Sequence, residues 1–164
     1  MRSRSCQRYA LLRSNGTKID LQLMEIVIRP KRGSPYRSSP RVYNAGRFAD
    51  YVIDAVQGKL YAKTAHPIWL LLYSTHWAFV PSVHVLYVLN RYFIQNQHVY
   101  ERVFVTELLD NSVANLSNIF PTLQGEKIDA FPKPRSVEEA RAQPFRLADP
   151  MDAKAQGNKL VWKL

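Results

Sequence analysis

Hydrophobic residues run without interruption through residues 67–74, which read Pro-Ile-Trp-Leu-Leu-Leu-Tyr-Ser. A half-buried strand alternates apolar and polar residues, and this run does not. The run therefore predicts a strand at 68–74 that is covered on both faces, as interior strands of largely parallel sheets are. We take this strand as the centre of the predicted fold.

Two segments with helical spacing flank the central run. Apolar residues recur at i, i+3 and i+4 over residues 45–62 and 82–96, which predicts two helices with one buried face each. Asn44 precedes the first segment and can act as its N-cap. Residues 100–106 are β-branched and aromatic, so we expect another strand, parallel to the central one. This order of strands and helices predicts an α/β fold with right-handed crossovers.

The N-terminal part predicts a β-hairpin. Residues 7–14 and 18–29 are strand-like and flank Asn15-Gly16. Both turn residues tolerate positive φ, and the pair is typical of a two-strand hairpin turn.

The C-terminal part is less regular. Residues 112–119 predict a short helix, whereas residues 121–156 are rich in Pro, Ala and charged residues and have little periodicity. We therefore expect one α/β domain over residues 1–121 and a loosely docked or disordered basic tail over residues 122–164.

Length and composition narrow the class of protein. A chain of 164 residues, 46% of them hydrophobic, has room for one domain with a core. No apolar run approaches the ~18 residues of a membrane span, and the basic N-terminus lacks the apolar centre of a secretory signal. We therefore expect a cytoplasmic protein that does not enter a membrane. The single cysteine, Cys6, excludes an internal disulfide framework and a cysteine-based zinc site.

The net charge of +10 is concentrated in the first third of the chain. Residues 1–47 contain eleven Lys and Arg and two acids, while residues 48–120 contain four and five. Such a surplus indicates a polyanionic partner or a solvated basic arm. Between residues 29 and 47, basic residues alternate with tyrosines, which suits nucleic acid. The candidate nucleic-acid-binding residues are Arg29, Lys31, Arg32, Arg37, Arg41 and Arg47.

The order of these elements resembles the restriction-endonuclease-like, or PD-(D/E)xK, superfamily. A hairpin strand with an internal acid, Glu25, is followed by a basic loop, a helix, the Trp-Leu-Leu-Leu-Tyr strand, a helix and a last strand. The resemblance covers roughly residues 7–121 and implies a three-layer α/β fold, a mixed sheet flanked by helices. It also implies Mg²⁺ bound by carboxylates, with a lysine that orients the attacking water.

The residues of that superfamily's motif are only partly present. Glu25 occupies the glutamate position, but Val27 stands where the lysine is expected and Arg8 near the place of the second carboxylate. Asp20 is the other nearby acid. It is five residues from Glu25, so the two would share a metal ion only if a β-bulge intervened. Lysines of the following helix, Lys59 or Lys63, could replace the missing lysine.

Two function classes follow from the sequence. The first is a nuclease-like protein, which hydrolyses phosphodiesters with Mg²⁺ at Glu25 and Asp20 with Lys59, or only binds nucleic acid if its motif has degenerated. The second is a structural or interaction protein that forms a homo-oligomer through exposed apolar segments.

Overall fold

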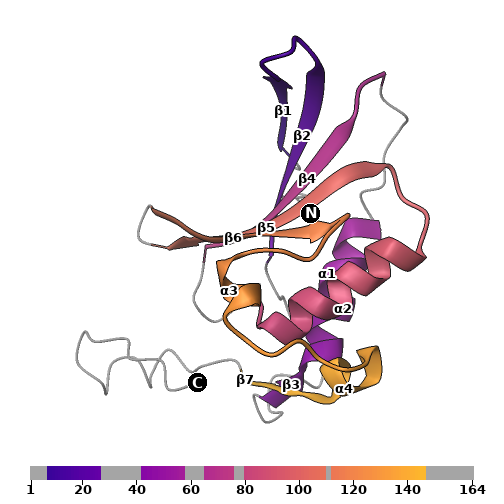
Figure 1. Ribbon diagram of the computed structural model, residues 1–164, viewed down its shortest axis with the longest axis vertical. Helices are drawn as coiled ribbons and strands as arrows, with labels where there is room; N and C mark the ends of the chain where they lie inside the picture. Colours follow the sequence, from indigo (N-terminus) through magenta and orange to yellow (C-terminus); the bar gives the residue numbers. More distant parts are fainter. Residues whose placement is uncertain (1–6, 27–41, 58–64, 76–79, 110–111, 147–164) are drawn as a thin grey trace, which may run out of the picture.

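The computed structural model describes residues 7–26, 42–57, 65–75, 80–109 and 112–146. Its centre is an open five-stranded sheet in the order β1-β2-β4-β5-β6 (Figure 1). The strands are β1 (Gln7–Leu12), β2 (Lys18–Glu25), β4 (Ile68–Ser74), β5 (Tyr100–Leu109) and β6 (Ser112–Phe120). The predicted strand at 68–74 is therefore confirmed, and it is the middle strand of the sheet.

The sheet is mixed, because its centre is parallel and its two outer pairs are antiparallel. β4 runs parallel to both β2 and β5, whereas β1 pairs antiparallel with β2 and β6 with β5. Helix α1 (Ala45–Gln57) lies in the connection between β2 and β4, and helix α2 (Val83–Gln95) connects β4 to β5. These pairings confirm the predicted α/β fold class and the parallel strand at 100–106.

Local signals in the sequence explain where several elements begin. Gly16 adopts a φ of +82° in the predicted hairpin turn. The Arg13 N–H donates to Thr17 O and the Gly16 N–H to Arg13 O, both at 2.9 Å, and these backbone bonds close the turn. The Thr17 N–H also donates to Asn15 Oδ1 at 3.0 Å. At the start of α1, the Arg47 N–H donates to Asn44 Oδ1 at 2.8 Å. Asn44 is therefore the N-cap expected from the sequence.

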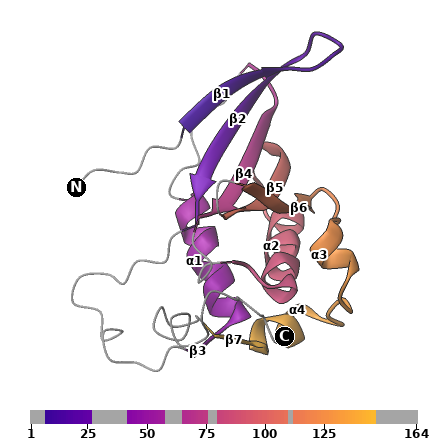
Figure 2. The same ribbon diagram turned by 90° about the vertical axis from the view of Figure 1, so that its left-hand side faces the viewer.

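The two faces of the sheet are buried to different extents. Leu70 and Leu72 of β4, like Val103 and Val105 of β5, are fully or almost fully buried against α1 and α2. The intervening β4 residues, Trp69, Leu71 and Tyr73, are only half-buried. All four described helices lie on the same side of the sheet (Figures 1 and 2). The helices of the described part thus cover one face of β4, whereas the sequence predicted cover on both.

Residues 112–120 form a strand, so the helix predicted there is wrong. Val113, Leu116 and Ile119 have helical spacing, but Val113 is 67% and Leu116 54% exposed. Between Val105 and Glu107 the register with β6 shifts, and Asn115 adopts a positive φ of 50°. This bulge inserts an extra residue into β6. It breaks the alternation of period two that would have identified the strand.

Residues 122–146 pack on the domain rather than forming a loosely docked tail. Helix α3 (Glu126–Asp129) and helix α4 (Val137–Ala142) each bury one side chain completely, Ile128 and Ala140. Strand β7 (Pro144–Arg146) pairs with β3 (Val42–Asn44), which directly precedes α1 in the sequence. The rest of the predicted tail, residues 147–164, lies outside the described residues. Short elements with one buried residue have no periodicity to detect in the sequence.

Close packing at Gly46 fixes α4 against the start of α1. A Cβ atom at Gly46 would lie 2.8 Å from Cβ of Arg141, so the two helices approach more closely than a larger residue permits.

In the described part of the chain, no helix is long and apolar enough to cross a bilayer.

The docking of α3 can be tested with Ile128→Ala. This change removes a fully buried side chain, so the free energy of unfolding should fall by about 2–5 kcal/mol in denaturant titrations. Ile94→Ala on α2 is the matched control, because Ile94 is 49% exposed, and it should cost about 0.5 kcal/mol or less. Equal effects of the two changes would contradict a docked α3.

Candidate nucleic-acid interface

The two carboxylates predicted to bind metal lie on opposite faces of the sheet. Residues 20–25 of β2 pair with residues 68–73 of β4 in unbroken register, so no bulge brings them together. Asp20 is level with Ile68, on the face that the helices cover, and Glu25 is level with Tyr73, on the other face. Five residues of extended strand also separate them by about 16 Å. Asp20 and Glu25 therefore do not form one metal site.

Glu25 nevertheless lies at a position where ligands bind in α/β proteins, beyond the carboxyl end of a parallel strand. Its Oε1 accepts a hydrogen bond of 2.6 Å from Thr75 Oγ1, at the carboxyl end of β4. Among the described residues, no three His, Cys, Asp or Glu side chains are grouped as metal ligands would be. The described side chains thus do not fit the Mg²⁺ site that the resemblance implies.

Most of the predicted basic residues lie in segments other than those that the structure describes. Outside the described residues lie Lys59, Lys63, Arg29, Lys31, Arg32, Arg37 and Arg41. Arg47 is described and is exposed in the first turn of α1. It lines an open depression of about 610 Å³, together with Asn44, Asp50, Glu138, Arg141 and Ala142.

The depression is balanced in charge. Both terminal nitrogens of Arg141 donate to the carboxylate of Asp50, at 3.0 and 2.6 Å. This hydrogen bonding raises the pKa of Arg141, and the negative charge of Asp50 adds to the effect while partial burial opposes it. Arg47 and Arg141 are thus matched by Asp50 and Glu138. The depression offers little net attraction for a polyanion.

A second polar cluster, around Glu107, has a structural role. Lys127 Nζ donates to Glu107 Oε1 at 3.1 Å, and Asn115 Nδ2 donates to Oε2 at 2.9 Å. The side chain of Glu107 is only 9% exposed, and both of its oxygens have partners. The cluster holds α3 against β5 and β6 and leaves no carboxylate oxygen without a protein partner.

Arginine and tryptophan meet on the sheet face that the described helices leave uncovered. Trp69 of β4 lies level with Leu21 of β2 and Arg102 of β5. The guanidinium carbon of Arg102 is 5.4 Å from the centre of the Trp69 ring, and that of Arg13, beside the hairpin turn, is 5.0 Å away. Both distances are those of cation–π contacts.

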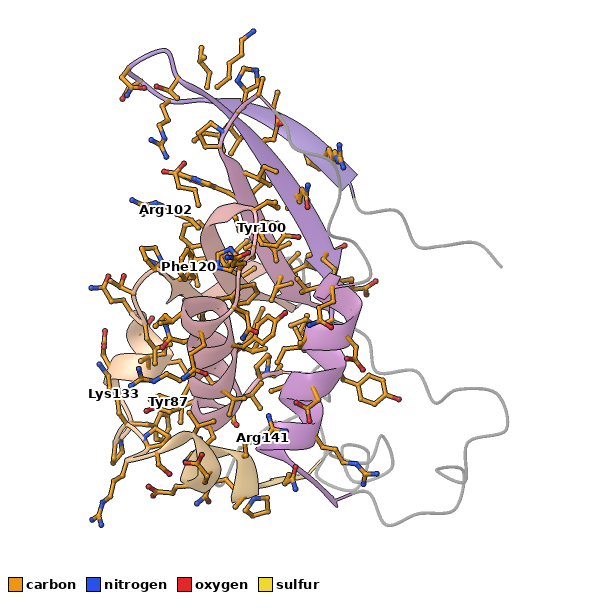
Figure 3. The ribbon with its side chains drawn as sticks, turned by 90° about the vertical axis from the view of Figure 1, so that its right-hand side faces the viewer. Tyr87, Tyr100, Arg102, Phe120, Lys133 and Arg141 are labelled. Atoms are coloured by element: carbon orange, nitrogen blue, oxygen red, sulfur yellow. The ribbon has the colours of Figure 1, made fainter. Side chains whose placement is uncertain are left out.

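Neighbouring residues extend this face. We call it the Trp69 face, and in the register of the sheet it comprises Tyr9, Leu11, Ile19, Leu21, Leu23, Trp69, Leu71, Arg102 and Phe104. The rings of Trp69 and Phe104 are 5.6 Å apart and tilted by 56°. Arg13 Nη2 donates to Glu101 Oε1 at 2.9 Å, which ties the hairpin to β5. Arg102 is exposed and lies well apart from Arg141, which is near α1 and α4 (Figure 3).

The sequence did not identify the Trp69 face, because its residues are far apart in the chain. Arg13 and Glu101 are 88 residues apart, and the register between strands that aligns Trp69 with Arg102 has no local signal. One clue was available. The predicted strand 100–106 contains two charged residues, Glu101 and Arg102. An arginine in an interior strand indicates that one face of the strand is accessible to solvent.

Comparisons with known proteins do not assign this chain to a family. A scan against models of protein families, a search of curated proteins and a search of solved structures find no match to this chain. The functional argument therefore depends on the arrangement of the chain's own residues.

The role of the Trp69 ring in the fold can be tested with two substitutions. Trp69 Nε1 is buried without a hydrogen-bond partner among the described residues, so Trp69→Phe removes an unpaired donor and keeps a ring. We expect a change in the free energy of unfolding of about 1 kcal/mol or less. Trp69→Ala removes the platform for both arginines and should cost about 2–3 kcal/mol, since the side chain is half-buried. Equal losses in thermal or chemical unfolding would contradict this view of the ring.

Proposed function

We propose that this chain is a nucleic-acid-binding protein of restriction-endonuclease-like type that does not hydrolyse its ligand. The strand order supports the fold comparison. A hairpin leads into β2, Glu25 lies at the carboxyl end of β2, and two helical crossovers place β4 and β5 parallel to it. In the three-layer class helices cover both faces of the sheet, whereas the described helices cover one. The resemblance is therefore one of strand order and connections.

The placement of the acids favours binding without hydrolysis. Two-metal or one-metal phosphodiester hydrolysis needs carboxylates that converge on the same ion. Asp20 and Glu25 are on opposite faces of β2, and Glu107 is paired with Lys127 and Asn115. The described residues therefore provide no set of carboxylates that could hold Mg²⁺ for hydrolysis.

The observation that carries the proposal is the pair of arginines over Trp69. Arg13 and Arg102 combine positive charge with a planar aromatic surface, the combination with which proteins hold phosphates and stacked bases. Arg8 and Lys18 are exposed on the same hairpin as Arg13. Since the first 47 residues contain eleven basic and two acidic side chains, a polyanion is the partner that this end of the chain attracts most strongly.

A homo-oligomer is the second candidate, and exposed apolar residues on the outer strands favour it. Leu12 of β1 is 69% exposed, and Val113 and Leu116 of β6 are similarly exposed. Outer strands with such residues can pair with a second copy. Pairing of β1 with β1 would bring the basic hairpins of two copies together, however, and like charges oppose it.

Binding across a salt series tests the proposed function. We expect the logarithm of the association constant for fluorescent nucleic acid to fall linearly as the logarithm of salt concentration rises. With Mg²⁺ or Mn²⁺ present, gels should show intact nucleic acid. If the unmodified protein cleaves the nucleic acid and Glu25→Gln does not, the function is hydrolysis and the proposal of binding alone is wrong. No binding at low salt, with a dimer in sedimentation, would favour the homo-oligomer.

A further inference from the structure

We infer that the ligand is single-stranded nucleic acid, bound across the Trp69 face with a base stacked on the guanidinium of Arg102. This inference rests on the proposed nucleic-acid binding and specifies the class of ligand and the surface. Three features carry it: the width of the face, its half-buried apolar residues, and the exposure of Arg102 without an ion pair among the described residues. An arginine on the helical side of the domain provides the control.

The face is wide enough for a short stretch of one strand. Three interstrand spacings separate β1 from β5, which makes about 14 Å of sheet surface. Four-stranded sheets of similar width stack two or three bases of single-stranded RNA on their aromatic residues. Tyr9 at one side is 47% exposed, and Phe104 at the other is half-buried.

Arg102 is the residue best prepared to contact a base. It is exposed, and within the described part of the chain it makes no ion pair, whereas Arg13 is paired with Glu101. Its guanidinium lies over Trp69, which limits its freedom before any ligand binds. A guanidinium plane stacks on bases and also attracts phosphates.

The apolar part of the face favours single strands over duplexes. Leu21, Leu71 and Phe104 are half-buried neighbours of Trp69. A single strand can lay unpaired base faces on such residues, because every base has an apolar π-face. A duplex presents its phosphates and keeps its base faces stacked inside the helix. Contact with this surface would therefore cost hydration of the phosphates without gaining stacking.

The helical side of the domain provides a matched control. Arg91 of α2 also lies over an aromatic ring, 5.2 Å from the centre of Tyr87, and is exposed. Its Nε and Nη2 donate to the Tyr87 hydroxyl at 3.3 and 3.2 Å. Arg91→Ala thus removes the same charge and the same type of contact as Arg102→Ala, but on the face that carries the helices.

The experiment measures fluorescence anisotropy of the full chain with labelled oligothymidine of about twelve nucleotides and with the corresponding duplex. The unmodified protein should bind the single strand at least about tenfold more tightly. Arg102→Ala should weaken single-strand binding roughly tenfold and reduce the salt slope by about 0.7, the change expected for one lost contact to a single strand. Arg102→Lys keeps the charge and should retain the salt slope, yet still lose several-fold in affinity. Arg91→Ala should change neither quantity beyond a general charge effect, and circular dichroism should show all variants folded.

The outcomes separate this inference from the proposed function. Equal affinity for single strand and duplex, or equal effects of Arg102→Ala and Arg91→Ala, would overturn the inference and leave nucleic-acid binding intact. Full rescue by Arg102→Lys would also overturn it, because only charge would then matter. If neither oligonucleotide binds at low salt, the proposed function itself is wrong.

Discussion

The packing of α1 and α2 on one face of β4 is the interaction on which the rest of the structure depends. Leu70 and Leu72 are almost fully buried there, and each such side chain contributes about 1.5–3 kcal/mol of hydrophobic free energy. The same packing sets the parallel register of β2, β4 and β5. Because side chains alternate along a strand, it also determines that Trp69 and Arg102 project from the other face.

That alternation connects the fold to the proposed function. The motif suggested by the sequence required two acids on one face, and the register instead separates Asp20 from Glu25. It aligns Trp69 with Arg102, and the hairpin brings Arg13 over the same ring. The polar groups elsewhere in the described part are largely matched to each other, as at Glu107 and Arg141. The Trp69 face therefore combines charge and aromatic surface in a way that suits a polyanion with unpaired bases.

Local signals made part of this architecture predictable. Asn15-Gly16 favours a turn, Asn44 caps a helix, and the β-branched and aromatic run at 100–106 favours a strand. The strand at 112–120 was missed because a bulge at Asn115 disguises its periodicity. The docking of α3 and α4 was missed because Ile128 and Ala140 are isolated apolar positions in a polar segment. The contacts at Trp69 depend on register between distant strands, which no local pattern encodes.

Photochemical cross-linking would test most directly that nucleic acid lies on the Trp69 face. A single-stranded oligonucleotide with photoreactive bases would be irradiated with the full chain, and the modified peptides would be identified by mass spectrometry. The account predicts cross-links in β1, β4 and β5, with Tyr9, Trp69 and Phe104 as the principal acceptors, since these aromatic residues lie on the face. Cross-links confined to α2 and α4, on the opposite side of the sheet, would contradict it.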